Sequence, residues 1–399
     1  MNRFTPPPFH GPLAGLKVLE IGSDVSVAFG ARLLSDLGAE IIKIEPPEGD
    51  ALRHAPPFVG KDESAFFAYL NRGKKFVGID ARTPDGWRLL GEIAAQCDLV
   101  IAEASVLKAG EIWPQRPVTL AISPHGVSGP ATERPSSPFV LQHASSFAFH
   151  QASPVSDPES TPPVGCADWE GGLAGGLVVA IAALWAAEGA TDARPGPMVD
   201  LSQEDILTYL LVEPFADWQA GMDVTARRRD PTKGLTIAGG LVWYLPCADG
   251  AVMVSPREDH QWRRWCEVMG NPAWTLDESL CGDRIVRTNN AAKLQEKMAV
   301  WSIEQRNRDV VTAAQAARVA CFPVSTPHDL LENEQLKDRR FFTPVAFENG
   351  ATLPMPGLPF RFVSQRGDEL ARGTGAVAPP AAERGETMLE TLLTAAEGL

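Results

Sequence analysis

One carboxylate, Asp168, stands at the start of a stretch that becomes almost wholly small or aliphatic, VGCADWEGGLAGGLVVAIAALW over residues 164–185. Its oxygens could accept hydrogen bonds from the free N–H groups of a first helical turn, as an N-cap does. The apolar run over 177–185 predicts a helix buried on every side. Glycines before this run leave a wall without side chains, so that another backbone or a ligand can approach closely; they are Gly171, Gly172, Gly175 and Gly176. Asp168 is therefore either a helix cap or a reactive carboxylate beside an apolar slot.

Other residues that could do chemistry form no complete pattern. The six cysteines have no CxxC spacing, which predicts neither a zinc site nor a disulfide framework. Cys166 is close to Asp168 but has no neighbouring histidine, so we interpret it as a small buried residue rather than a nucleophile. The loop SPHGVSGP at 123–130 is similar to the GxSxG nucleophile elbow, but it ends in Pro130, which argues against a serine hydrolase. No metal or redox cofactor is expected.

Composition limits the class of protein. With 399 residues the chain is long enough for two domains, and its 44% hydrophobic and 22% charged residues are ordinary for a globular protein. A formal charge of −14 argues against nucleic acid or an anionic membrane as the main partner. No secretory leader is evident, and the longest apolar run, 177–187, is shorter than the roughly 20 residues that cross a bilayer. We therefore expect a cytoplasmic protein with reduced thiols.

The N-terminal part alternates short apolar runs with helical patterns. Residues 16–21, 27–37 and 40–44 predict strand, helix and strand, the unit that builds a parallel sheet. Further strands are expected at 76–79, 98–102 and 118–122, and a helix capped by Thr83 at 84–96. This order predicts an α/β fold with a Rossmann-like doubly wound sheet. The turn after Gly22 has no GxGxxG motif, which argues against a dinucleotide dehydrogenase.

A smaller domain is expected further along the chain. Residues 199–211 predict one long helix, and 241–255 predicts a β-hairpin around CADG. Helices are expected around 260–269, 290–301 and 307–318, strands at 344–347 and 358–362, and an amphipathic helix over 381–399. We thus expect a large Rossmann-like domain over 1–215, a small α+β domain over 228–325, and a segment 335–399 that returns to the large domain.

Seven segments between residues 11 and 362 resemble, in the same order, the class III CoA-transferases, the family of formyl-CoA transferase and carnitine CoA-transferase. They include LLSDLGAEIIKIEPPEGDALR (33–53), LNRGKKFVGIDARTPDG (70–86), ADWEGG (167–172) and PMVDLSQEDILTYLL (197–211). The resemblance implies that Asp168 is the nucleophile of acyl-CoA:carboxylate CoA transfer, through an aspartyl anhydride and then an aspartyl-CoA thioester. It also implies a homodimer of two interlocked ring-like chains. Acyl-CoA and a small carboxylic acid would be the substrates, with no permanently bound cofactor.

The same resemblance places the contacts to CoA. Arg82 and Lys108 are the cations expected to meet its phosphates, and Arg53 is a weaker candidate. The remaining predicted CoA-binding positions are Val25, Ser26, Ile79, Glu103, Gly239 and Gly240. Backbone amides near Gly239 and Gly240, or near Gly171 and Gly172, are the hypothetical donors to the oxyanion. The chain departs from the family at Val25 (usually Gln), at Glu103-Ala104 (usually Asn-Phe) and at Ser136-Ser137 (usually Gly-Tyr).

Two other functions are compatible with these segments. The α-methylacyl-CoA racemases share them, but they need a base on each face of the substrate, and Ser137 stands where they have a histidine. His143 and His150 are at a different spacing, and Glu258 or Asp259 could be a further acid or only a helix cap. A non-catalytic CoA-binding homologue is the third possibility. The acid is not defined by the sequence, because Trp169, Trp218 and Trp243 could line an acyl pocket or simply pack in a core.

Overall fold

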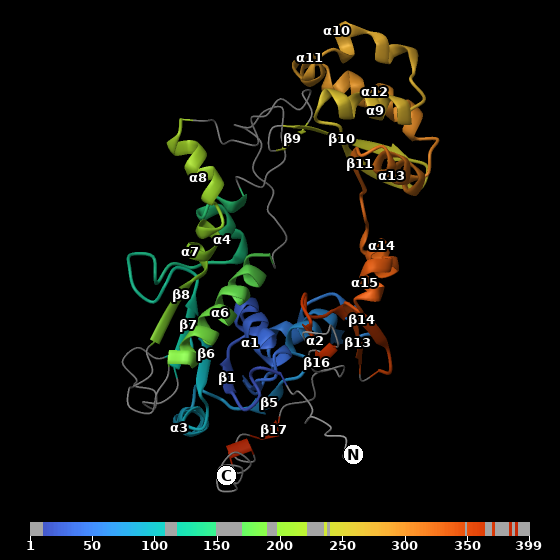
Figure 1. The fold of residues 1–399 in the computed structure, drawn as a ribbon. Helices are drawn as coiled ribbons and strands as arrows, with labels where there is room; N and C mark the ends of the chain where they lie inside the picture. The colour runs from blue at the N-terminus through green and yellow to red at the C-terminus, as the bar shows by residue number, and fades with distance from the viewer. Residues whose placement is uncertain are drawn as a thin grey trace, which may run out of the picture. The chain divides into compact units, whose positions relative to one another are not determined.

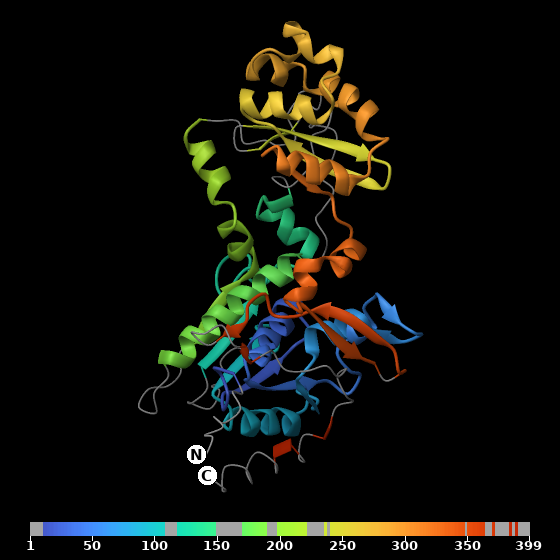
Figure 2. The same cartoon turned by 45° about the vertical axis from the view of Figure 1, so that its right-hand side comes forward.

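The computed structural model describes residues 11–107, 118–148, 170–189, 198–221, 235–237, 240–347, 349–363, 369–371, 383–384 and 388–389. The chain divides into two compact units. Among the described residues, the first unit takes those up to Ala148, those of 170–221 and those from Glu334 onward, and the second takes 235–333. Figures 1 and 2 show the elements of each unit from two directions.

A parallel sheet forms the centre of the first unit. Over the described residues it has seven strands in the order β17-β5-β2-β1-β6-β7-β8, and every neighbouring pair is parallel. The strands are β1 (Lys17–Ile21), β2 (Glu40–Glu45), β5 (Lys75–Gly78), β6 (Leu99–Glu103), β7 (Val118–Ser123), β8 (Met198–Ser202) and β17 (Glu383–Arg384). The sheet is wound outward in both directions from β1, which confirms the predicted α/β, Rossmann-like class.

Helices cover both faces of this sheet (Figure 1). On one face, α1 (Val25–Asp36) and α6 (Glu170–Gly189) share a core with Val18 of β1. On the other face, α3 (Pro84–Ala94) packs with Leu19. The unit also contains η1 (Ala51–His54), β3 (Phe58–Val59), β4 (Glu63–Ser64), α2 (Ala65–Asn71), α4 (Pro138–Ala144), α7 (Gln203–Tyr209), α8 (Val212–Gln219), α15 (Glu334–Asp338), β13 (Phe342–Ala346), β14 (Thr352–Pro356), β15 (Phe362–Val363) and β16 (Glu369–Ala371).

The second unit is an antiparallel sheet with helices, in the strand order β12-β11-β10-β9. The predicted hairpin is confirmed as β10 and β11, with Cys247 paired to Gly250 at its turn. Trp243 and Trp265 are fully buried in its core. Its elements are β9 (Leu235–Ile237), β10 (Gly240–Cys247), β11 (Gly250–Ser255), α9 (Asp259–Val268), η4 (Ala273–Leu276), α10 (Glu278–Cys281), α11 (Arg284–Asn289), α12 (Ala291–Ser302), α13 (Asn307–Ala316), β12 (Ala320–Pro323) and α14 (Pro327–Glu332).

The prediction of one helix over 199–211 is wrong. Residues 198–202 form β8, which extends the sheet beyond β7, and α7 begins only at Gln203. Ser202 marks the boundary, because its side chain accepts a hydrogen bond from the N–H of Asp205 and caps the helix. Val199 and Leu201 are two residues apart, which fits the alternation of a strand. The helical spacing comes from Ile206, Tyr209 and Leu210, and pairing with β7 makes residues 198–202 a strand.

Two predictions near the C-terminus are also wrong. The partner strand of β13 is β14, which precedes the strand expected at 358–362; only Phe362 of that range lies in a strand. Within the helix expected over 381–399, residues 383–384 instead form β17, parallel to β5, whereas the described residues 388–389 are helical. Proline-rich and charged segments carry little hydrophobic periodicity, so their strand pairing depends on partners far away in the sequence.

Helix α6 is only half buried, which corrects the expectation of burial on every side. Val179 and Ala183 are buried against α1 and the sheet. The opposite face exposes large apolar side chains, with Ile181 66% and Trp185 69% accessible. The apolar run thus predicted the hydrophobic character of α6 correctly. It did not predict whether other elements of the same chain cover both faces of the helix.

Candidate active site

The turn that follows β1 is held by the end of β6. These strands are neighbours, and the strand order reverses between them, which is where ligands bind in doubly wound sheets. The chain leaves β1 through Gly22, Ser23 and Asp24 and enters α1. Glu103 Oε1 accepts hydrogen bonds from the backbone N–H of Ser23 at 2.5 Å and of Asp24 at 2.6 Å. Glu103 therefore fixes the shape of the turn at this crevice.

Glu103 fits because residue 22 is glycine. Gly22 has a φ of +120°, and a Cβ there would lie 2.5 Å from Glu103 Oε1. Burial raises the pKa of the Glu103 carboxyl, and repulsion from Asp24 raises it further, while the two backbone hydrogen bonds lower it. These N–H groups precede α1, where an anion such as phosphate would otherwise bind. The protein's own carboxylate thus occupies that position.

A hollow of about 250 Å³, which we call the strand-end hollow, opens beside Glu103. It brings together three of the predicted CoA-binding residues, Ile79, Arg82 and Glu103. The other residues around it are Ile21, Gly22, Ser23, Ile44, Pro46, Glu48, Asp80, Ala81 and Val106. Because parallel strands end at one edge, segments spread over residues 21–106 meet here.

Arg82 is the cation at the rim of the strand-end hollow. Its guanidinium donates to Asp80 Oδ1 at 2.7 Å and to Glu48 Oε1 at 2.9 Å, and its side chain is 66% exposed. The hydrogen bonds and attraction of these carboxylates raise the pKa of Arg82, and the pairing lowers that of Asp80. An exposed pair of this kind exchanges partners at little cost, so Arg82 can turn to a phosphate.

Two other predicted CoA-binding residues, Arg53 and Ser26, line neither the strand-end hollow nor a second hollow at the start of α6. Arg53 donates to Glu45 Oε1 at 2.9 Å, and its guanidinium lies 4.2 Å from the ring centre of Phe67. Burial raises the pKa of Glu45 despite this partner. Ser26 is fully buried, and its Oγ accepts from Gln203 Nε2 at 3.0 Å. These contacts give both residues structural roles in the first unit.

The glycines of α6 allow α1 to approach closely. A Cβ at Gly172 would lie 2.7 Å from Val25, one at Gly175 would lie 2.4 Å from Ser26 Oγ, and one at Gly176 would lie 2.8 Å from Phe29. Distances this short are not tolerated between real atoms, so side chains there would force the helices apart. Of the two uses expected for these glycines, approach of another backbone is the one observed for 172, 175 and 176.

A second hollow, of about 160 Å³, lies at the start of α6, and we call it the helix-start hollow. It is surrounded by Asp24, Val25, Pro124, Ser136, Ser137, Pro138, Leu141, Gly171, Gly172, Gln203 and Leu207. Val25 is the predicted CoA-binding residue found here. Gly171 and Gly172 belong to the first turn of α6, whose N–H groups have no partner within the helix. The turn after β1 therefore lines both hollows, with Gly22 and Ser23 at one and Asp24 and Val25 at the other.

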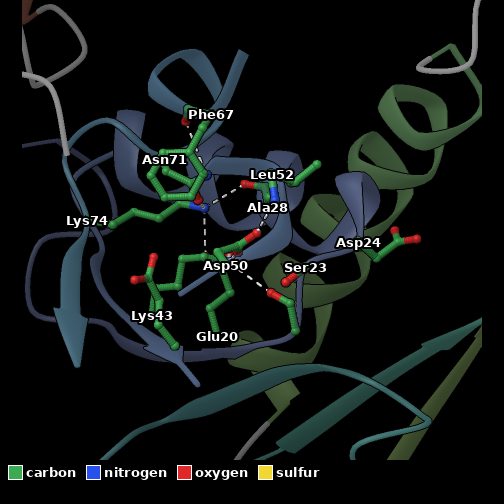
Figure 3. Close-up of polar contacts among 12 residues, drawn as sticks. Glu20, Ser23, Asp24, Ala28, Lys43, Asp50, Leu52, Phe67, Asn71 and Lys74 are labelled. Carbon is green, nitrogen blue, oxygen red and sulfur yellow. Dashed lines mark hydrogen bonds and ion pairs between the residues drawn. The ribbon is translucent and has the colours of Figure 1, made fainter. Parts of the chain in front are cut away.

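A buried network of ion pairs lies beside the turn after β1 and contacts it (Figure 3). Lys43 Nζ donates to Glu20 Oε1 at 2.8 Å and to the carbonyl of Gly22 at 2.9 Å, and it lies 2.7 Å from Asp50 Oδ2. Lys74 Nζ contacts Glu20 Oε2 at 2.6 Å. It also donates to the carbonyl of Ala28 at 2.8 Å and to Asn71 Oδ1 at 2.7 Å. Both lysine side chains and Glu20 are 0% exposed.

The two lysines differ in electrostatics. Burial lowers the pKa of Lys43, but attraction and hydrogen bonds from Glu20 and Asp50 outweigh burial and raise it above the ordinary value. For Lys74, burial dominates over the attraction of Glu20, and the pKa falls to about 8. This network was not predicted from the sequence. Its signal was a charged residue within each of two apolar strands, Glu20 in LKVLEI and Lys43 in EIIKI.

Several predicted residues are outside the part of the chain that the structure describes. They are Asp168, Lys108, Gly239, Cys166, His150 and Trp169. Gly240 is described and begins β10 of the second unit, paired with Ile237. Trp243 is a core residue whose Nε1 donates to the carbonyl of Ala291 at 3.0 Å, and Trp218 is exposed on α8. Neither tryptophan lines the two hollows.

The described residues that bear on the racemase alternative have other partners. Ser137 caps α4 by accepting from the N–H of Val140 at 3.3 Å. His143 Nδ1 lies 2.8 Å from the carbonyl oxygen of Phe139 in the same helix. Glu258 is the N-cap residue of α9, which confirms the helix-cap alternative for this residue. Asp259 pairs with the buried Arg287 at 2.5 Å, and the hydrogen bond from Arg287 lowers the pKa of Asp259.

Further features of the described residues concern metals, thiols and membranes. Within the described ranges, no group of three His, Cys, Asp or Glu side chains could hold a metal ion. Five cysteines are free and buried: Cys97, Cys247, Cys266, Cys281 and Cys321. Among the helices that the structure describes, none has the length and hydropathy needed to span a membrane.

Comparison with known proteins now identifies the family. Residues 13–374 match the model of CoA-transferase family III. The chain is 23% identical over 361 residues to a succinate--glutarate CoA-transferase of Agrobacterium fabrum, covering 86% of this chain and 87% of that one. It is 24% identical over 365 residues to the human succinyl-CoA:glutarate CoA-transferase, covering 88% of this chain and 80% of the relative.

A solved structure agrees in fold. The crystal structure of a CAIB/BAIF family protein from Brucella suis superposes with a TM-score of 0.80 at 24% identity, covering 96% of this chain and all of that one. The chain therefore belongs to CoA-transferase family III, and the resemblance stated from its seven segments is confirmed. The prediction that it is an enzyme of the class III CoA-transferases is confirmed with it.

Proposed function

We propose that this enzyme transfers CoA from an acyl-CoA thioester to a free carboxylic acid through a covalent intermediate on Asp168. The observation that carries the proposal is the position of Asp168 in a family III chain: it comes two residues before α6, whose first turn lines the helix-start hollow. A poorly solvated carboxylate is a better nucleophile, and the sequence that follows Asp168 becomes small or aliphatic.

In each step of the transfer, one bond to an acyl carbon forms and another breaks. The Asp168 carboxylate attacks the thioester carbonyl, and the C–S bond breaks to give a mixed anhydride and CoA thiolate. The thiolate then attacks the aspartyl carbonyl, which releases the first acid and leaves an aspartyl-CoA thioester. An incoming carboxylate reverses both steps and leaves as the new acyl-CoA. Covalent catalysis of this kind divides one difficult exchange into easier acyl transfers.

The strand-end hollow is our proposed site for the adenosine end of CoA. Arg82 at its rim, together with Lys108, would meet the phosphates as a cation. Glu103 already occupies the N–H groups before α1, so the phosphates do not bind there, and an uncharged group with hydrogen-bond donors fits beside its carboxylate. Ile79 contributes apolar surface to the same hollow. CoA enters as substrate, and we propose no permanently bound cofactor.

Backbone N–H groups are the proposed donors to the oxyanion that forms at each acyl transfer. Gly171 and Gly172 have the required N–H groups in the first turn of α6, and they line the helix-start hollow. Gly239 and Gly240 remain the alternative donors. A donor aimed at developing negative charge stabilises the transition state more than the ground state.

We propose that the enzyme is a homodimer, with the interlocked form that the family resemblance implies. Exposed apolar side chains on three helices of the first unit support a second copy as partner: Leu177, Ile181, Trp185, Tyr209, Val212 and Trp218. Uncovered patches of this kind mark interaction surfaces. We also propose a cytoplasmic location, since free buried cysteines are typical of a reducing compartment.

Replacement of Asp168 tests the proposed reaction. In Asp168→Ala, exchange of radiolabelled acid into acyl-CoA should fall by about 10³-fold or more, because the nucleophile of both half-reactions is gone. Hydroxylamine should trap an activated aspartyl group in the wild type and not in the variant. The matched control is Asp85→Ala, an exposed carboxylate on α3, which should retain exchange.

The same assays separate the alternatives. Unchanged acid exchange in Asp168→Ala would refute the nucleophile. Exchange of the substrate α-proton with deuterium from solvent, without acid exchange, would instead identify a racemase. Binding of CoA without either activity would identify a non-catalytic homologue.

A further inference from the structure

The helix-start hollow lies within reach of the proposed nucleophile. Gly171 lines the hollow and follows Asp168 by three residues, a distance that the chain spans in at most about 11 Å. An acyl group attached to Asp168, or to the sulfur that attacks it, is therefore close enough to extend into this space. The inference drawn from this rests on the proposed function.

The size of the helix-start hollow limits the size of the acid that it can hold. Its volume of about 160 Å³ is close to that of cavities that hold one benzene molecule, roughly six non-hydrogen atoms. Apolar side chains supply much of its wall, among them Val25, Leu141 and Leu207. This wall suits a short carbon chain.

The charge of the hollow is the more selective feature. Asp24 is the charged residue among its lining residues, and no lysine, arginine or histidine belongs to this set of described residues. Asp24 Oδ1 accepts from the N–H of Ser26 at 2.7 Å, and both carboxylate oxygens accept from Gln203 Nε2 at 3.0 Å. These partners are neutral. In Figure 3 the Asp24 carboxylate points away from Lys43 and Lys74.

One polar group of the hollow is ready to accept a ligand. The hydroxyl oxygen of Ser136 is buried and has no hydrogen-bond partner. A hydroxyl both donates and accepts, so it can bind an amide, keto or hydroxyl group of a ligand. Hydrogen bonding to a buried group left without a partner recovers its desolvation cost.

We propose that the helix-start hollow binds the carbon chain of the transferred acid, and that it selects a short acid with an uncharged far end because Asp24 repels a second carboxylate. Two like charges in a site of low dielectric repel strongly, and the described lining residues include no cation that would screen them. Ser136 favours a polar far end, and the Asp24 carboxylate is what requires that end to be uncharged. The Agrobacterium relative is named for two dicarboxylic acids, succinate and glutarate, so the proposal distinguishes this chain from that relative.

Two acids of the same shape test the proposal. Succinate and its monoamide succinamate differ in one atom and in the charge of the far end. With propionyl-CoA as CoA donor and the full chain as enzyme, formation of each new acyl-CoA is followed by mass spectrometry. We expect kcat/KM for succinamate to exceed that for succinate at least tenfold. Equal use of the two acids, or preference for succinate, would overturn the proposal.

Removal of the charge should remove the selection. In Asp24→Asn the capping oxygen is kept, since Asn is also a good N-cap, and the succinamate preference should shrink to threefold or less. Asp85→Asn, which removes a surface carboxylate on α3, is the matched control and should keep the wild-type ratio. A ratio that does not change in folded Asp24→Asn would show that Asp24 does not select the acid.

A second variant tests the placement of the carbon chain without relying on charge. A methyl group at residue 171 would lie 3.5 Å from Leu207, an ordinary contact, so Gly171→Ala should fold while narrowing the hollow. We expect its preference for acetate over pentanoate to rise at least fivefold relative to the wild type. An unchanged profile would place the carbon chain elsewhere. Absence of CoA exchange with every acid would instead refute the proposed function, whereas exchange with the wrong acids refutes only this inference.

Discussion

The strand-end hollow and the helix-start hollow share one turn but differ in how they are built. The first lies at the ends of parallel strands, and its rim carries Arg82 with Asp80 and Glu48 in exposed ion pairs. The second lies at the start of α6, and among its described lining residues Asp24 is the charged one, with no lysine, arginine or histidine. The same crevice therefore offers an exposed, charged rim for a phosphorylated carrier and a smaller hollow for the group that is transferred.

The shared turn is the point at which both hollows can be disturbed at once. Lys43→Met should lower the free energy of unfolding by about 3–5 kcal/mol, because Glu20 and Asp50 would keep their buried charges without this partner. The carbonyl of Gly22 would also lose its donor. Urea denaturation measures the free energy of unfolding. A changed KM for acyl-CoA would show that the turn after β1 has been disturbed.

Lys75→Met is the control for Lys43→Met. Lys75 lies in the same sheet but its side chain is 52% exposed, so its loss should change stability by less than about 0.5 kcal/mol. If both variants were equally stable, the buried network would not support the turn.

The other lysine of the network predicts a pH dependence. Its pKa of about 8 lies below the ordinary 10.5. Between these values the unfolded chain binds more protons than the folded one, so Lys74 makes stability rise with pH. When Lys74 is deprotonated in both the folded and the unfolded state, the gain in the free energy of unfolding is on the order of 3 kcal/mol. Below pH 8 Lys74 is protonated in both states, and none of this gain is present. The stability of wild type relative to Lys74→Met should therefore increase from pH 7 to pH 9.5.

The stability difference between wild type and Lys75→Met should stay constant over this range, because the Lys75 side chain is exposed. A stability difference between wild type and Lys74→Met that stays constant or falls with pH would show that Lys74 is not titrating in the folded protein.

A change at the helix interface should disturb the helix-start hollow alone. In Gly175→Val the added atoms would meet Ser26 Oγ, since a Cβ there lies 2.4 Å from it, and overpacking should cost about 1–3 kcal/mol. We expect altered acid preference with an unchanged dissociation constant for CoA. Gly91 of α3 has nothing within 4 Å of a Cβ, so Gly91→Val should leave both properties intact. Weaker CoA binding in Gly175→Val would mean that the hollows are not separable.

The smallest effect is expected at the rim of the strand-end hollow. Arg82→Gln should raise KM for acyl-CoA about three- to tenfold, because one exposed cation for the phosphates is lost. The kcat and the melting temperature should stay the same, and the difference from wild type should shrink at high salt. Arg88→Gln removes another exposed, paired arginine on α3 and should leave KM unchanged. An unaltered KM in Arg82→Gln would exclude Arg82 as a phosphate contact.

Much of the fold could be predicted from local patterns, because short apolar strands that alternate with helices are typical of a parallel sheet. The failures have a common cause. The helical spacing of Ile206 and Leu210 does not show where the helix begins, and only pairing with β7 makes residues 198–202 a strand. Strand β17 is another example, since its two residues gain their strand character from β5, about 300 residues earlier in the chain.

The family, the doubly wound order of strands and helices, and the grouping of glycines after Asp168 could all be inferred from the amino-acid sequence alone. These depend on residue types and on short spacings, which the chain carries along its length. Only the tertiary structure decided that Glu103 occupies the N–H groups before α1, that Lys43 and Lys74 share Glu20, and that Ile79 and Arg82 meet at one hollow. Hydrogen bonds and ion pairs act over a few ångströms, so their partners are defined only when the sheet has brought distant segments together.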